Sequence, residues 1–156
     1  MPQTAVEPID LWLPAVGVGL IGLCLTIHSF FLFAVLHSHA RFSRLCPDLH
    51  GVWMLVPSVL LATALIAASC CIQIFLWALV LLSTGDFALF RDALYYSSTT
   101  YTTLGASHRV LHAPYRVLES LEATNGLLAN GLNTAILFAV ISSLARRRSG
   151  YEEFFP

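Results

Sequence analysis

The sequence predicts an all-α integral membrane protein with three transmembrane helices and one short helix that does not cross the bilayer. Of its 156 residues, 57% are hydrophobic and only 11% are charged, whereas soluble domains carry about 25% charged residues. The mean hydropathy is +0.75. Three apolar stretches also reach the length of about 20 residues that a bilayer-spanning helix needs. We therefore expect the lipid bilayer to be the main partner of this surface.

The three predicted spans run from about 11 to 36, from 52 to 82 and from 117 to 144. Pro14 and Pro57 fall in the first turns of their segments, where a missing N–H costs little. The first stretch lacks a basic start and is too long for the apolar part of a signal peptide, so it is predicted to remain in the membrane. Cys24, Cys46, Cys70 and Cys71 show no metal-ligand spacing and are predicted to be packing residues rather than disulfides.

Charge placement predicts the orientation of the spans. Arginine is the only basic residue type, and the clusters lie after the first span and after the third: Arg41, Arg44, Arg146, Arg147 and Arg148. With three spans these clusters share one side, whereas the N-terminal segment carries Glu7 and Asp10 and no basic residue. The positive-inside rule then predicts an external N-terminus and a cytoplasmic C-terminus, in what we expect to be a bacterial inner membrane.

Several function classes are disfavoured. The net charge of −1 and the lack of a basic stripe predict no nucleic-acid partner. No nucleophile–base pair, metal cluster or cofactor motif indicates an enzyme, a cofactor or a metal site. His37 and His39 sit at the end of the first span, where a solvated loop is the expected environment. Three spans without an internal repeat also argue against a carrier.

The segment between the second and third spans has a distinctive pattern. A helix from about 87 to 99 would have some three turns, too few to cross a membrane, and Thr102-Thr103-Leu104-Gly105 follows it. Non-helical backbone at membrane depth is tolerated only where it is buried in protein or lines water. A pore built from several subunits meets that condition.

This segment resembles the two-transmembrane, pore-loop family of tetrameric potassium-type channels. The residues that carry the resemblance are Ala93-Leu94-Tyr95-Tyr96-Ser97 and Thr100-Tyr101-Thr102-Thr103-Leu104-Gly105, and the likeness covers about 86 to 144. It implies a homotetramer whose filter is formed by Thr102, Thr103, Leu104, Gly105, Ala106 and Ser107, with K⁺ or Na⁺ as permeant ions. It also divides the chain into an N-terminal end, extra helix and loop (1–50), a pore domain (51–145) and a cytoplasmic tail (146–156).

The chain departs from the family in the outer half of the filter. Gly105-Ala106-Ser107-His108 stands where the family has Gly-Tyr-Gly-Asp, and a non-glycine residue pays about 1–2 kcal/mol to enter left-handed backbone space. We therefore expect a shorter or wider filter and weak selectivity among monovalent cations. His108 and Arg109 would stand at the outer mouth. Arg109 is expected to reach headgroups or a carboxylate rather than the axis, and a pH-sensing role for His108 is the less favoured reading.

A polar stripe marks one face of the third span. On helical spacing Glu119, Glu122, Gly126, Asn130 and Asn133 fall within an arc of about 80°, and Leu137 continues the stripe. The stripe either lines a water-filled cavity that narrows to an apolar gate or packs against neighbouring helices, with asparagines as interhelical glue. For Glu122 packing is favoured, because in the family a glutamate near the start of this helix braces the pore helix.

The first span has no counterpart in the minimal family. Thr26, His28 and Ser29 are its polar residues, and it either buttresses the core or docks an accessory membrane partner. In the second span Ser69 and Gln73 are spaced to contact the pore unit. The functional hypothesis is a subunit of a tetrameric cation channel, and the alternative is a non-conducting structural or accessory subunit with the same fold.

Overall fold

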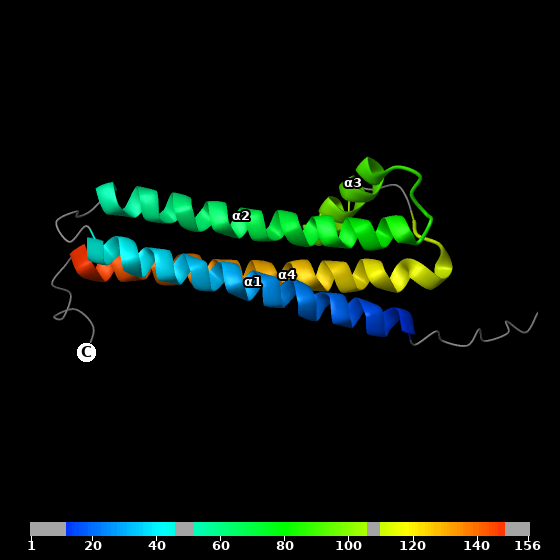
Figure 1. Cartoon of the computed structure of the whole chain (residues 1–156), viewed down its shortest axis with the longest axis horizontal. Helices are drawn as coiled ribbons and strands as arrows, with labels where there is room; N and C mark the ends of the chain where they lie inside the picture. Colours follow the sequence, from blue (N-terminus) through cyan, green and yellow to red (C-terminus); the bar gives the residue numbers. More distant parts are fainter. Residues whose placement is uncertain (1–11, 46–51, 106–109, 149–156) are drawn as a thin grey trace, which may run out of the picture.

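A computed structural model describes residues 12–45, 52–105 and 110–148, and within these ranges every regular element is a helix (Figure 1). The elements are α1 (Trp12–Leu45), α2 (Val52–Ser83), α3 (Phe90–Tyr101), the short 3₁₀ turn η1 (Ala113–Tyr115) and α4 (Arg116–Arg148). In this part of the chain three helices are long and apolar enough to cross a membrane: Trp12–Leu45, Trp53–Ser83 and Arg116–Ser143. The prediction of an all-helical chain with three apolar spans is confirmed.

The three long helices run side by side, and α3 lies beside α2 near one end of the bundle (Figure 1). α1 packs on both α2 and α4, while α3 packs on α2 and α4. The start of α1, the end of α2 and the start of α4 lie at the end that carries α3. The end of α1, the start of α2 and the end of α4 lie at the opposite end, so the two predicted arginine clusters belong to the same end of the bundle.

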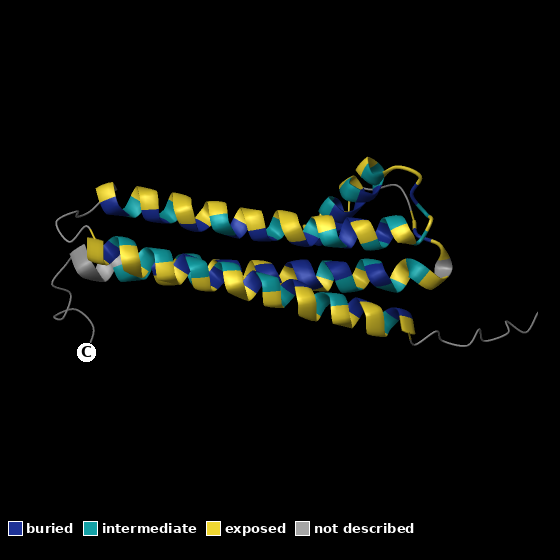
Figure 2. Cartoon of the chain, in the orientation of Figure 1, coloured by how far each residue is buried: buried dark blue, intermediate teal, exposed yellow. Residues whose placement is uncertain are grey.

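Buried residues line the helix surfaces that face one another, and exposed residues cover the outside (Figure 2). The exposed residues include large apolar side chains, such as Phe30 at 71% and Phe33 at 67%. Five polar side chains are completely buried between the spans: His28, Ser69, Gln73, Glu122 and Asn125. This distribution suits a protein whose outer solvent is hydrocarbon, because polar groups in spans normally face the bundle interior or water.

α1 is longer than the sequence predicts. The predicted span ends near residue 36 with a solvated loop after it, whereas the helix continues to Leu45. No glycine or proline interrupts the segment before Pro47, so nothing local ends the helix earlier. His39 uses this extension, because its Nε2 lies 2.7 Å from the Ser143 hydroxyl oxygen of α4.

α3 begins three residues later than predicted, because residues 84–89 turn the chain back from the end of α2. The amides of Thr84 and Gly85 bond to carbonyls of the last α2 turn, and Gly85 has a φ of 83°, which glycine adopts without steric cost. Phe87 is buried against Leu81 and Tyr96. This packing fixes the entry of the chain into α3.

Candidate functional site

Ser97 anchors α3 to both α2 and α4. Its hydroxyl oxygen lies 2.9 Å from the Ile74 carbonyl oxygen of α2 and 2.5 Å from a carboxyl oxygen of Glu122 on α4. Ser97 and Glu122 are both completely buried. Because this hydroxyl is in hydrogen-bond contact with both spans away from competing water, it holds α3 against α2 and α4.

The end of α3 rests on a glycine of α4. A Cβ atom at Gly126 would lie 2.8 Å from the carbonyl carbon of Tyr101 and closer still to the carbonyl oxygen. Tyr101 is 1% exposed. Because the obstacle is backbone rather than a flexible side chain, only glycine fits this point of contact.

The chain leaves α3 through a closed turn. Thr103 N–H donates to the Thr100 carbonyl at 2.9 Å, and Leu104 N–H donates to the Thr99 carbonyl at 2.9 Å. This pair of bonds forms a Schellman motif, in which the first residue after the helix C-cap takes the left-handed conformation. That residue is Thr103, with φ 58°, the one non-glycine residue with positive φ in the described ranges. A β-branched side chain in this region is strained.

Four of the predicted filter residues, Thr102, Thr103, Leu104 and Gly105, belong to this turn and are all exposed. Their amides bond back to the last turn of α3, so within one chain they cap the helix. The remaining predicted residues, Ala106, Ser107, His108 and Arg109, lie outside the described residues.

An open groove of about 370 Å³ runs beside this turn and along the start of α4. Its lining residues include hydroxyl groups, one basic and one acidic side chain: Thr100, Thr103, Gly105, Arg116, Glu119, Ser120 and Ala123. Arg116 uses its Nε–H to bond the Leu111 carbonyl at 3.1 Å. The groove therefore joins the predicted filter segment to one face of α4.

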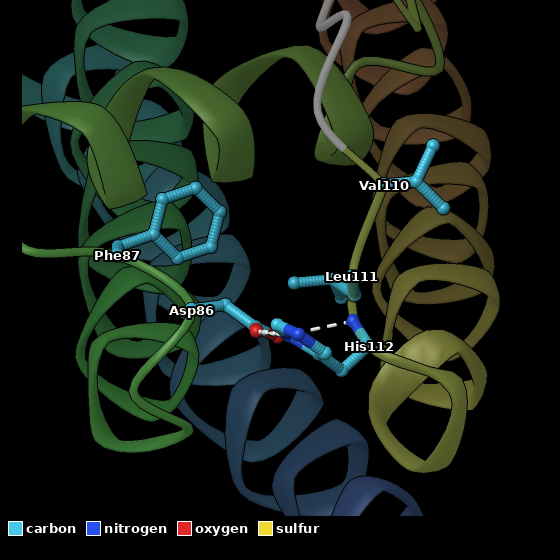
Figure 3. A pocket seen from close by; sticks show the side chains of 5 residues that line it. All are labelled: Asp86, Phe87, Val110, Leu111 and His112. Atoms are coloured by element: carbon cyan, nitrogen blue, oxygen red, sulfur yellow. Dashed lines mark hydrogen bonds and ion pairs between the residues drawn. The ribbon is translucent and has the colours of Figure 1, made fainter.

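Asp86 and His112 tie together the two ends of the segment that carries α3 (Figure 3). The Asp86 carboxylate accepts the His112 backbone N–H at 3.3 Å and pairs with the imidazole Nδ1. The carboxyl side chain is 9% exposed and the imidazole 83%. A pocket of about 290 Å³ lies beside the pair and is also lined by Phe87, Val110 and Leu111.

A second buried polar cluster joins the three long helices. The His28 Nδ1 atom of α1 lies 2.8 Å from the Ser69 hydroxyl and 3.2 Å from the Gln73 amide nitrogen, both on α2. Gln73 in turn accepts from the Asn125 amide of α4 at 3.1 Å. With the Gln73 amide nitrogen facing the imidazole, His28 Nδ1 is the acceptor and the ring hydrogen sits on Nε2.

The predicted stripe of α4 faces mainly into the protein. Glu122 and Gly126 are buried against α3, and Asn133 is 8% exposed with its amide 3.7 Å from the Cys70 sulfur. Leu137 packs beside the apolar cluster around Val140. Within one chain, Glu122, Gly126 and Asn133 therefore pack against neighbouring helices, while Leu137 is half-buried. Asn130 is the exception, because its side chain is exposed.

Sequence reasoning did not predict the Asp86–His112 pair. The available signal was position, since Asp86 lies four residues after the second predicted span and His112 five residues before the third. In the described residues no group of three or more His, Cys, Asp or Glu side chains is arranged to hold a metal ion.

The chain matches no protein-family profile, no curated protein and no solved structure. Function must therefore be argued from the arrangement itself. That arrangement is a short helix packed on two spans, with its exposed C-terminal turn beside the groove at the start of α4.

Proposed function

We propose that this chain is one subunit of a homotetrameric pore-loop cation channel, weakly selective among monovalent cations such as K⁺ and Na⁺. In this proposal α3 is the re-entrant pore helix, Thr102–Ser107 form the filter region, and α2 and α4 are the outer and inner helices. The N-terminus lies outside and the arginine-rich end of the bundle lies in the cytoplasm.

The observation that carries the proposal is the depth at which α3 ends. Tyr101 meets α4 at Gly126, ten residues after Arg116, which corresponds to about 15 Å at 1.5 Å per residue. Ser97 meets α2 at Ile74, nine residues before Ser83, or about 14 Å from that helix end. The two spans have 28 and 31 residues, or about 42 and 46 Å, and extend beyond a hydrocarbon core of about 30 Å at both ends. The end of α3 would then lie inside the outer half of the core.

The chemistry at this end of α3 favours cations. The C-terminal end of a helix carries the negative end of its dipole, and the exposed turn from Thr102 to Gly105 adds hydroxyl and carbonyl oxygens. Oxygen ligands of this type replace the water shell of a permeating cation in pore-loop channels. The missing second filter glycine, at Ser107, supports weak rather than strict selectivity.

The alternative is a non-conducting subunit that keeps the same fold. It is favoured by the Schellman turn, because the amides of Leu104 and Gly105 are committed to the Thr99 carbonyl. In that case the segment would serve as a plug that fixes α3 between the spans.

Flux and subunit count test the proposal together. The purified protein is reconstituted into potassium-loaded liposomes, rubidium uptake is measured, and the mass of the assembly is determined by native mass spectrometry. We expect a tetramer and uptake above that of empty liposomes. A tetramer without uptake of any monovalent cation would rule out the channel and leave the structural subunit.

A filter variant separates the two functions further. The double change Ala106→Tyr and Ser107→Gly restores the residue types that the family has at these positions. If the segment is a filter, the ratio of potassium to sodium flux should rise. A ratio and a total flux that both stay unchanged favour the plugged subunit.

A further inference from the structure

We infer that copies of this chain meet around their common axis through one face of α4, which we term the open face and define by Ser120, Thr124, Leu127, Gly131 and Thr134. This inference rests on the proposed function, because it names the residues of α4 that surround the pore. It differs from the stripe for which the sequence left pore lining open, since Glu122, Gly126 and Asn133 are used inside the chain.

The open face is the side of α4 that none of the other described helices covers. α4 contacts α1, α2 and α3, and the buried positions Leu118, Glu122, Asn125, Ala129 and Asn133 share the opposite side of the helix. The five residues of the open face are all exposed and fall within about 80° of arc at 100° per residue. A Cβ added at Gly131 would meet no atom within 4 Å. One side of α4 therefore has no partner within the described part of the chain.

One polar group on this side is poorly suited to lipid. The hydroxyls of Ser120, Thr124 and Thr134 are satisfied, because they bond to carbonyls of their own helix at 2.8–3.0 Å. Asn130, at the border of the open face, is exposed, and its side-chain amide has no hydrogen-bond partner among the described residues. It lies in the middle of the span Arg116–Ser143, where an unsatisfied amide in hydrocarbon costs several kcal/mol.

A second copy of the chain can supply hydrogen-bond partners for the Asn130 side-chain amide. An amide side chain both donates and accepts, so amides brought together by rotational symmetry satisfy one another or hold water between them. Polar side chains of this kind act as glue between membrane helices. Lipid hydrocarbon can neither form a hydrogen bond nor hold water at this depth.

Charge complementarity at the outer end of α4 points to the same partner. Arg116 and Glu119 both line the groove beside Thr103, and within the described ranges neither takes part in an ion pair. In a ring of identical subunits, Arg116 of one copy can pair with Glu119 of the next, and this head-to-tail contact closes without leaving an unpaired charge. The groove also makes the open face continuous with the exposed turn at the end of α3.

Cysteine cross-linking tests the inference. The four native cysteines are replaced by alanine, and single cysteines are placed on the open face as Leu127→Cys and Thr134→Cys. Matched controls are Leu132→Cys, exposed on another side of α4, and Ala64→Cys, exposed on α2. The intact assembly in liposomes is oxidised with copper phenanthroline and separated by non-reducing electrophoresis.

We expect covalent dimers at Leu127→Cys and Thr134→Cys and only monomers at the two control positions. This result supports the interface whether or not the liposomes conduct, so a failure of the channel function is recognised separately by the flux assay. Dimers at the control positions instead, or no dimers at either test position in an assembly shown to be tetrameric, overturn the inference.

A charge-reversal pair provides a second measurement. Arg116→Glu and Glu119→Arg, made singly, should each raise the concentration at which the tetramer dissociates by about tenfold, which corresponds to about 1.4 kcal/mol. The double reversal should restore the parental value, because the pair is complementary again. Single reversals that leave assembly unchanged, or a double reversal that sums the two losses, contradict the pairing.

Discussion

Gly126 of α4 lies directly beneath the Tyr101 carbonyl at the end of α3, at a separation that leaves no room for a Cβ atom. Together with the Ser97–Glu122 hydrogen bond, this contact determines how deeply α3 enters between α2 and α4. The position of the exposed turn that follows therefore depends on the absence of a Cβ atom at Gly126 and on the carboxyl group of Glu122.

Changing Gly126 to alanine should displace the end of α3. The added methyl group overlaps backbone, so we expect a loss of about 1–3 kcal/mol of unfolding free energy and a strong reduction of any cation flux. Unfolding in detergent and rubidium uptake in liposomes measure the two effects. Gly22→Ala is the control, because a Cβ there meets no atom within 4 Å. Equal losses in both variants would show that the close contact is not the cause.

Removing the Ser97–Glu122 hydrogen bond should loosen α3. Ser97→Ala leaves a buried carboxylate oxygen without its donor, and we expect a cost of about 1–3 kcal/mol. Glu122→Gln keeps an oxygen acceptor and should cost less than Glu122→Ala. A double-mutant cycle should give a coupling energy of about 0.5–3 kcal/mol. Ser98→Ala is the control, since that hydroxyl bonds only its own helix at Tyr95, and a coupling near zero would contradict the assignment.

His28 should matter for the attachment of α1. His28→Leu removes the bonds to Ser69 and Gln73, and interhelical hydrogen bonds in membranes contribute about 0.6 kcal/mol on average and up to about 1.7 kcal/mol. We expect a loss in this range, measured by reversible unfolding. Ser29→Ala, which affects only a bond within α1, should have little effect. Nitrogen NMR of the parent should find the His28 hydrogen on Nε2, and a hydrogen on Nδ1 would contradict the network.

Thr103 should be more stable as glycine. Its left-handed backbone costs a non-glycine residue about 1–2 kcal/mol, so Thr103→Gly is expected to raise the unfolding free energy by up to that amount. The neighbouring change Thr102→Gly should act in the opposite direction, because Thr102 has a right-handed conformation with φ −80°. Thermal unfolding of both variants checks the difference in sign. Destabilisation by Thr103→Gly would exclude the strained turn.

Asp86 should hold together the two ends of the segment that carries α3. Asp86→Asn weakens the bonds to the His112 imidazole and amide, so hydrogen exchange at His112 and Leu111 should become faster. Asp92→Asn is the matched control, because its contact with Arg91 spans 3.6 Å between side chains that are 37% and 81% exposed, and such surface pairs contribute little. The same exchange rate in the parent and in Asp86→Asn would contradict this role.

Much of the fold could be predicted from the sequence, because membrane spans depend on apolar length more than on tertiary detail. α2 was predicted within one residue at its C-terminal end. The end of α1 was misplaced by nine residues, since hydropathy falls at His37 while nothing in the local sequence stops the helix before Pro47. The extension is stabilised by the contact of His39 with Ser143. These two residues are more than a hundred positions apart in the sequence.

The candidate site could be predicted less well. A helical wheel correctly groups Glu122, Gly126 and Asn133 on one side of α4, but it does not identify the neighbour of that side. Their partners are Ser97, Tyr101 and Cys70, which other helices supply. Polar residues inside a span could therefore be recognised as interior positions, whereas the choice between protein and pore interior required the positions of α1, α2 and α3.

The polar and close backbone contacts that anchor α3 belong to two spans, to α2 at Ile74 and to α4 at Glu122 and Gly126. Its position therefore depends on how α2 and α4 sit relative to each other. If the crossing angle between α2 and α4 changes, the carbonyl and carboxyl groups that Ser97 bridges move apart or together, and α3 must tilt or slide with them. The turn at Thr102–Gly105 follows directly on α3, so a small change in the angle between two long helices displaces four exposed residues.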